Sequence, residues 1–342
     1  MVNSSPYIRC LDARFYLKMN LSFIVYPPPS QLKIDASIVW SILLTAILVI
    51  NITLLGIICA KSSLRILNNI LVGSLCIANI LFCVFYILPA KVILIGNSII
   101  PFTNIYCQLS HTVFQLAFFC CINFHISSIS LDKLINVASP FWYDQNRKYK
   151  LIMFAAILFT CWVLPTFMAF LPFMISWWRI CPYFCVISER KADRILNLTI
   201  WHTFWPIFMF LMPTVITVTF YGRIFTIARN HDRRLRAGSL PSSERRIITR
   251  SGVKAAKTVI IIVGVYLLFQ MPYHIFQVIN VLDRDLSRAA NKYNLREWLL
   301  FLASCNSVFS PIIYGCHDLH LRNALKSLSC FKPLKKLWKA SS

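Results

Sequence analysis

The seven histidines are the first residues to test for catalytic or metal-binding chemistry. They show no HExxH spacing, and no serine or cysteine has a base partner that the sequence places beside it. His317 and His320 are close enough to share a helix face, but a metal site needs more ligands than these two supply. There is also no glycine-rich loop of the kind that binds a nucleotide cofactor. The sequence therefore predicts no enzyme, no metal site and no cofactor.

The stretch from Cys107 to Pro140 has chemically different ends. A cysteine begins it, and the segment Asp132-Lys133-Leu134 closes its mostly apolar middle part. At a rise of about 1.5 Å per residue, a helix of this length crosses the hydrocarbon core of a bilayer. Because its two ends would face different sides of a membrane, the stretch predicts a helix that transmits a signal.

Composition places the whole chain in a membrane. Of 342 residues, 58% are hydrophobic and only 14% are charged, whereas a soluble domain carries about a quarter charged residues. Mean hydropathy is +0.65. The sequence contains neither a short internal repeat nor two similar halves, both of which occur in many transporters. We therefore expect a polytopic, all-α membrane protein.

Apolar stretches of membrane-spanning length recur along the chain and predict a seven-transmembrane-helix bundle. Pro206 and Pro213 in the fifth stretch and Pro272 in the sixth predict kinks. This division predicts three parts: an extracellular segment (1–36), the helical domain (37–316) and a cytoplasmic tail (317–342). The expected spans are Ser37–Ala60, Asn68–Lys91, Asn104–Leu134, Leu151–Met174, Leu198–Ala228, Val253–Leu282 and Leu295–Cys316.

The basic residues predict the orientation. With the N-terminus outside, the inner segments hold 22 of the 35 Lys and Arg residues and the outer segments hold 13. Because cytoplasmic loops carry the excess of positive charge, this arrangement is the favoured one. The net charge of +23 is thus mainly a topology signal and does not indicate nucleic-acid binding. The outer side retains a modest net positive charge, which would attract an anionic ligand.

Several residues on the expected outer side are candidates for covalent modification. Four cysteines there face an oxidising environment and allow three pairings. These are Cys10, Cys107, Cys181 and Cys185. Three N-x-S/T sequons lie on the same side and predict glycosylation. They are headed by Asn3, Asn20 and Asn197.

The C-terminal tail shows a second membrane signal. Residues Asp318–Leu328 place leucines and an alanine at helical spacing, with Arg322 and Lys326 among them, which predicts a short amphipathic helix on the inner leaflet. Cys330 follows and is succeeded by several lysines. This cysteine is either a site of S-acylation or a free thiol on a solvated tail.

A set of ordered landmarks resembles the rhodopsin-like (class A) G-protein-coupled receptors. The match covers roughly residues 37–330 and includes Cys107 at the head of the third stretch and Asp132-Lys133-Leu134 at its end. The further landmarks are Asn51, Trp162, Pro213 with Tyr221, Pro272, and Ser310-Pro311-Ile312-Ile313-Tyr314. The resemblance implies a plasma-membrane receptor with an outer ligand pocket and an inner face for a heterotrimeric G protein.

The chain departs from the family pattern at five positions. Asn79 replaces the aspartate that usually anchors a sodium ion, and a neutral amide is a much poorer cation ligand. Lys133 keeps the charge of the usual arginine but lacks its planar fork, and Leu134 replaces the tyrosine beside it. Gln270 and Ser310 replace a tryptophan and an asparagine. These changes concern signalling more than the fold.

The resemblance also implies roles for individual residues. It pairs Cys107 with Cys185, with Cys181 as the alternative. It places the G-protein-coupling residues at the inner end of the bundle. They are Asp132, Lys133, Tyr221 and Tyr314.

Polar and aromatic side chains that face the bundle near its outer end are the candidate ligand contacts. Such groups are costly in hydrocarbon unless paired, so their convergence at similar depth predicts a cavity. Any one of them would alternatively serve as an interhelical hydrogen bond or an interfacial anchor. Gln115 stands where amine receptors carry an aspartate, so the ligand is expected not to be an amine. The set comprises His111, Gln115, Phe119, Trp201, His202, Trp205, Tyr273, His274, Gln277 and Ser304.

The functional expectation is a receptor whose ligand moves the fifth and sixth helices and thereby activates a G protein. Two alternatives keep the same fold: an odorant-like chemosensory receptor, and a non-signalling binder or heteromer partner. A transporter or channel is disfavoured, because such proteins need acids within the membrane and Asp132 is the only acid expected near a span.

Overall fold

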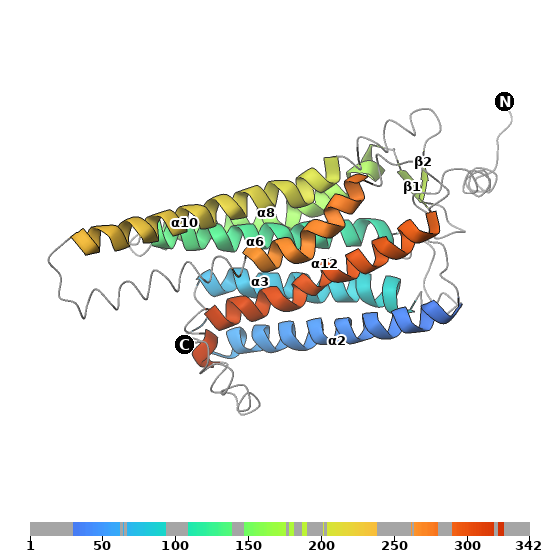
Figure 1. Cartoon of the computed structure of the whole chain (residues 1–342), viewed down its shortest axis with the longest axis horizontal. Helices are drawn as coiled ribbons and strands as arrows, with labels where there is room; N and C mark the ends of the chain where they lie inside the picture. The colour runs from blue at the N-terminus through green and yellow to red at the C-terminus, as the bar shows by residue number, and fades with distance from the viewer. Residues whose placement is uncertain are drawn as a thin grey trace.

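The computed structural model confirms the predicted fold class. It describes residues 30–61, 64, 67–93, 109–138, 147–175, 178–180, 187–189, 201, 204–237, 261, 263–279, 289–317 and 321–324. Within these ranges the chain is nearly all helical (Figure 1). Among the described residues, six helices are long and apolar enough to cross a membrane, and Val263–Ile279 is a shorter apolar helix. Together they form the seven-helix bundle that hydropathy predicted.

The helices fall close to the expected spans. The fourth apolar stretch, Leu151–Met174, agrees at both ends, and the sixth is described only over the helix Val263–Ile279. The third begins with a π-helical turn, η3 (Ser110–Phe114), that runs directly into α6. The long α-helices are α2 (Ser30–Ala60), α3 (Leu67–Phe82), α6 (Gln115–Ala138), α8 (Arg147–Met174), α10 (Met212–Ala237) and α12 (Ala289–His317).

Two helices contain π-helical segments near prolines. The second membrane span ends in η2 (Cys83–Ile93), which contains Pro89. The fifth span contains η4 (Ile207–Leu211), preceded by Pro206 and followed closely by Pro213. Proline lacks a backbone N–H and its ring clashes with the carbonyl one turn earlier, so the regular hydrogen-bond ladder is interrupted there. The predicted distortion of the fifth span therefore takes the form of a π-helical turn.

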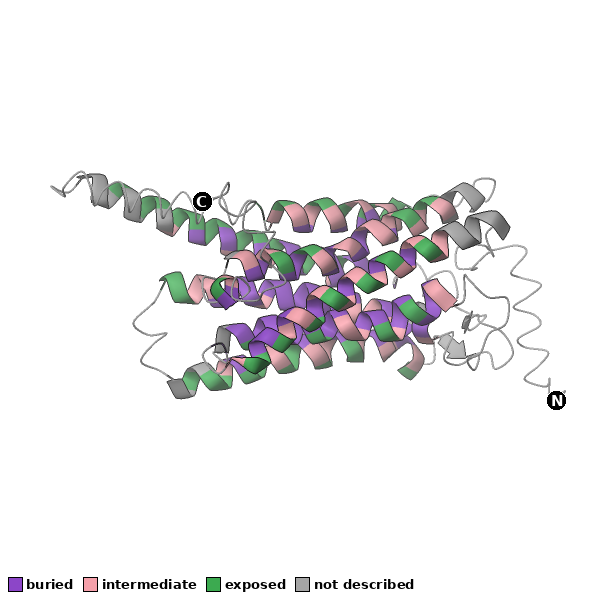
Figure 2. Cartoon of the chain, turned by 90° about the horizontal axis from the view of Figure 1, so that it is seen from below, coloured by how far each residue is buried: buried purple, intermediate pink, exposed green. Residues whose placement is uncertain are grey.

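The bundle is built around α6, which packs against α3, α8 and α10, while α2 packs against α3, η2 and α12. Figure 2 shows that buried residues face the interior of the bundle and exposed ones face outward. The outward residues include large apolar side chains: Ile42 is 66% exposed, Phe159 65% and Leu268 65%. Such an apolar exterior is what hydrocarbon requires, because lipid rather than water solvates it.

Asparagine side chains tie the first, second and seventh helices together. Asn51 Nδ2 donates to the Ser307 carbonyl oxygen at 3.1 Å, and Asn79 Nδ2 donates to Asn51 Oδ1 at 2.9 Å. Both asparagines are fully buried. The amide at position 79 therefore serves as a neutral hydrogen-bond donor at the centre of the bundle.

A second polar cluster joins the second, third and fourth helices. The Ser74 hydroxyl accepts a bond from Trp162 Nε1 at 2.9 Å and lies 2.8 Å from His125 Nε2. His125 Nδ1 is 2.7 Å from the Cys121 carbonyl oxygen, which can only accept, so Nδ1 carries the proton and Ser74 donates to Nε2. The imidazole also meets the Trp162 ring edge-on at 5.6 Å. This directed chain of bonds holds α6 against α3 and α8.

A short hairpin lies at the end of the bundle where α2 and α12 begin (Figure 1). Its strands, β1 (Trp178–Ile180) and β2 (Ile187–Glu189), are antiparallel, with Trp178 opposite Glu189. At the C-terminal end of the described chain, residues 321–324 are helical, and Leu321 and Ala324 are buried. The rest of the predicted amphipathic helix lies outside the described residues.

Candidate ligand pocket and inner face

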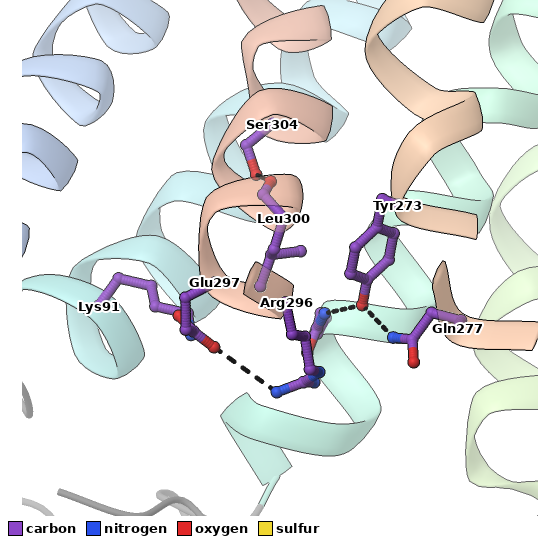
Figure 3. A network of polar contacts seen from close by, with 8 residues as sticks. Lys91, Tyr273, Gln277, Arg296, Glu297, Leu300 and Ser304 are labelled. Carbon is purple, nitrogen blue, oxygen red and sulfur yellow. Dashed lines mark hydrogen bonds and ion pairs between the residues drawn. The ribbon is translucent and has the colours of Figure 1, made fainter. Parts of the chain in front are cut away.

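The Tyr273 hydroxyl is the centre of a polar network inside the bundle. It accepts hydrogen bonds from Gln115 Nε2 at 3.0 Å and from Gln277 Nε2 at 2.6 Å (Figure 3). Gln115 is the first residue of α6, and Tyr273 and Gln277 lie one turn apart in Val263–Ile279. Gln115 is 4% exposed, so its amide depends on Tyr273 for a partner. The network connects the third helix with the sixth.

Aromatic rings line the network on the side of the second and third helices. The Phe119 ring centroid lies 6.1 Å from that of Tyr273 and 5.1 Å from that of Phe82, which it meets edge-on. Phe82 in turn stacks on Tyr86 at 5.3 Å. A ligand that reached Tyr273 would therefore find apolar ring surface next to hydrogen-bonding groups.

His274 carries an unused hydrogen-bonding atom. Its ring stacks on Phe210 with centroids 4.4 Å apart and planes 11° apart, and it lies 5.3 Å from the Tyr273 ring. The side chain is 3% exposed, and Nε2 has no hydrogen-bond partner among the described residues. A buried polar atom without a partner is costly, so this nitrogen is a candidate contact for a ligand atom or a water molecule.

Other predicted contacts are engaged elsewhere. Trp201 and Trp205 stack on each other at 5.0 Å, and Trp205 Nε1 donates to Met209 Sδ at 2.7 Å. Ser304 donates its hydroxyl to the Leu300 carbonyl oxygen of its own helix. Of the ten predicted ligand residues, the described contacts bring together Gln115, Phe119, Tyr273, His274 and Gln277.

The remaining predictions of site residues lie where the structure gives no description. They are the His111 side chain, His202, the cysteines Cys107, Cys181, Cys185 and Cys330, and the sequon residues Asn3, Asn20 and Asn197.

A buried ion pair near the pocket was missed at the sequence level. Lys91 Nζ lies 2.6 Å from Glu297 Oε2 and 5.7 Å from the ring centroids of Trp40 and Tyr86. Arg296 Nη1 is 3.5 Å from Glu297 Oε1. The expectation that Asp132 is the only acid near a span is therefore wrong, since Glu297 lies inside the span Asn294–Cys316. The signal was present in the sequence: Lys91 ends the second apolar stretch, and Glu297, beside Arg296, lies at the start of the seventh, at the same expected end of the bundle.

At the opposite end of the bundle, the structure brings two predicted coupling residues into contact. Lys133 Nζ lies over the Tyr314 ring, 5.0 Å from its centroid. Tyr314 and Tyr221 are both buried, and Asp132 is 2% exposed. A lysine in this place presents a compact charge to an aromatic face, which is a cation–π contact.

Comparison with known proteins identifies the family. The family model described as "7 transmembrane receptor (rhodopsin family)" matches residues 50–314. Mouse trace amine-associated receptor 7b is 28% identical over 272 residues, which is 71% of each chain. Human 5-hydroxytryptamine receptor 4 is 28% identical over 308 residues, covering 82% of this chain and 75% of the relative. The chain belongs to the rhodopsin family of seven-transmembrane receptors.

Family membership agrees with the arrangement of the molecule. Its apolar exterior and long apolar helices make it a multi-pass membrane protein, and its relatives are G-protein-coupled receptors. The polar network at one end of the bundle and the Lys133–Tyr314 contact at the other lie on opposite sides of the apolar core.

Proposed function

We propose that this chain is a receptor whose extracellular ligand binds between the third and sixth helices and thereby activates a heterotrimeric G protein. The observation that carries the proposal is the unpartnered Nε2 of His274 beside the Tyr273 network. A histidine nitrogen, a tyrosine hydroxyl and an amide within about one turn of the sixth helix, together with the Gln115 amide of α6, offer hydrogen bonds of both polarities.

The orientation of the chain supports an extracellular position for this site. Lys and Arg are in excess on the segments expected at the end of the bundle that holds Lys133 and Tyr314. This excess favours an N-terminus outside and a C-terminus in the cytoplasm. The Tyr273 network then lies nearer the outer end of the bundle, and the Lys133–Tyr314 contact lies at the cytoplasmic end, where a G protein would bind.

The proposed ligand is not a protonated amine. Two relatives are named for amines, namely trace amine-associated receptor 7b and 5-hydroxytryptamine receptor 4. In this chain Gln115 is neutral and already donates to Tyr273. Glu297 is held by Lys91 and lies beside Arg296. Among the described residues of the pocket, each carboxylate already lies beside a cation, so an ammonium group would have to compete with that cation.

Contact between helices provides the route from ligand to G protein. His274 belongs to the sixth helix and stacks on Phe210 of η4, in the fifth. A ligand that hydrogen-bonds to His274 would therefore act on the sixth helix directly and on the fifth through the stacked Phe210 ring. It shifts them only if it binds more tightly to one of their two arrangements.

The test is guanine-nucleotide exchange on purified G proteins by the receptor in lipid nanodiscs, with a panel of neutral and anionic small molecules. A true ligand changes the exchange rate, and His274→Ala weakens its potency about tenfold or more, as expected for the loss of one buried hydrogen bond. Thr166→Ala on the lipid-facing side of α8 is the matched control and should leave potency unchanged. Equal potency of the two variants would contradict the assignment of the pocket.

A further inference from the structure

Pro213 removes the regular hydrogen-bond donor of one backbone carbonyl in the fifth helix. In a regular α-helix the amide of residue 213 would donate to the carbonyl oxygen four residues earlier, which is that of Met209. Proline has no amide hydrogen to donate. The preceding amide, that of Met212, is engaged with the Ile207 carbonyl oxygen. A donor from a neighbouring helix therefore stabilises the Met209 carbonyl, because hydrocarbon offers no water to pair it.

Asn123 of α6 supplies such a donor. Its Nδ2 lies 2.9 Å from the Met209 carbonyl oxygen, and the contact is buried. Because a carbonyl oxygen can only accept, the amide is held with Nδ2 towards the fifth helix. Its Oδ1 has no hydrogen-bond partner among the described residues, although Asn123 is fully buried. An unpaired buried oxygen is costly, so the favourable polar contact of this side chain is the one with Met209.

Ser127, one turn further along α6, lies against the same proline. Its Oγ is 2.9 Å from the Pro213 carbonyl oxygen, 3.0 Å from Thr217 Oγ1 and 3.1 Å from the Asn123 carbonyl oxygen. A single hydroxyl hydrogen has two carbonyl acceptors here, one of them on its own helix. Ser127 can thus remain paired without the fifth helix, whereas the Asn123 amide has Met209 as its acceptor there.

The contact between Asn123 and Met209 lies next to the candidate ligand contact of the sixth helix. Phe210 follows Met209 in the chain, and its ring stacks on that of His274 with centroids 4.4 Å apart. A ligand that moves the His274 ring would move Phe210 and, through the backbone, the carbonyl that Asn123 holds. The strength of this hydrogen bond therefore contributes to the free energy of moving the fifth helix.

We propose that Asn123 is the positioning residue that keeps the fifth helix in the arrangement described, by pairing the Met209 carbonyl that Pro213 deprives of its regular donor. In this arrangement Tyr221 and Tyr314, two of the expected coupling residues, are buried and unavailable to a partner protein. Loss of the contact favours other arrangements and so raises ligand-independent signalling. The inference rests on the proposed function, because it names a residue that regulates it.

The experiment is a double-mutant cycle between Asn123→Leu and Pro213→Ala, made in the full-length receptor. Basal guanine-nucleotide exchange per folded receptor and apparent Tm are measured for all four forms. Asn123→Leu alone should raise basal exchange about fivefold, as the loss of one hydrogen bond predicts. In the Pro213→Ala background the restored amide can serve the Met209 carbonyl, so the same change should alter exchange about twofold or less.

The apparent Tm tests the hydrogen bond without any signalling. The effect of Asn123→Leu on the apparent Tm should be less favourable by about 3 °C when residue 213 is proline than when it is alanine. Asn123→Ala repeats the cycle with a smaller side chain, and the same non-additivity is expected even if Asn123→Leu does not fold.

Asn69 on α3 provides the matched control. It is also a buried asparagine whose Nδ2 donates to a backbone carbonyl oxygen, that of Leu64 at 3.0 Å. Since this carbonyl does not depend on Pro213, Asn69→Leu should have the same effect on both readouts with or without Pro213→Ala.

The outcomes separate this inference from the proposed function. Strict additivity of Asn123→Leu and Pro213→Ala in the apparent Tm overturns the role of the hydrogen bond. Non-additivity in the apparent Tm with an unchanged or lower basal rate in Asn123→Leu overturns the regulatory role and leaves a structural contact. Absence of exchange by every form on every G protein overturns the proposed function and the regulatory role together, while the apparent Tm still decides the contact.

Discussion

Removing the negative charge of Glu297 should destabilise the protein severely. In Glu297→Gln the Lys91 ammonium, 3% exposed and 2.6 Å from its carboxylate partner, is left in the bundle without a counter-ion. Breaking a buried pair by removing one partner costs about 3–5 kcal/mol. The rings of Trp40 and Tyr86, each 5.7 Å away, recover only a small part of that cost.

The same geometry predicts unequal effects for the other members of the cluster. Lys91→Met should cost less than Glu297→Gln, because Glu297 keeps Arg296 at 3.5 Å. Arg296→Gln should cost about 0–1 kcal/mol, since its side chain is 28% exposed. The double variant Lys91→Met with Glu297→Leu leaves no buried charge and should be close to wild type or more stable.

Thermal unfolding of the purified receptor in one detergent, with matched scan rates, provides the measurement. The expected loss of unfolding free energy in Glu297→Gln corresponds to a fall in apparent Tm of about 10 °C. An apparent Tm for Glu297→Gln equal to that of Arg296→Gln would refute the reasoning. A double variant less stable than either single variant would refute it as well.

Three further predictions concern the polar contacts inside the bundle. Tyr273→Phe removes the acceptor of Gln115 Nε2 and should cost about 1–3 kcal/mol, seen as a lower apparent Tm; an unchanged value would contradict the network. Ser74→Ala and His125→Phe should show a coupling energy of about 1 kcal/mol in a double-mutant cycle of unfolding, and strict additivity would argue against their bond. Asn79→Asp places a carboxylate in a fully buried position, so the apparent Tm should fall in choline chloride and should be restored in sodium chloride. Identical curves in the two salts would disprove this.

Much of the fold follows from hydropathy alone, because a bilayer admits few spanning structures. Every backbone polar group must be paired within the helix, so apolar length determines where each span lies. The described bounds of Leu151–Met174 agree with the prediction at both ends. Tyr273 and Gln277, both expected to face the bundle near its outer end, share a hydrogen bond in the structure.

Other features depend on long-range packing that the sequence does not reveal. Lys91 and Glu297 are 206 residues apart, and each looked like the edge of an apolar stretch. Only the packing of both η2 and α12 against α2 brings the two charges together. Stacking also decides which candidate ligand residues are available: Trp205 is engaged by Met209, whereas His274 retains an unpartnered nitrogen.

The most direct test of the receptor function needs no known ligand. Basal guanine-nucleotide exchange is measured on each family of purified heterotrimeric G proteins, with the wild-type receptor, Lys133→Ala and empty nanodiscs in parallel. Lys133 contacts Tyr314 at the proposed G-protein face, so its loss should change the basal rate that the wild type produces. Exchange equal to that of empty nanodiscs for both receptor forms, on every G protein, would contradict the account.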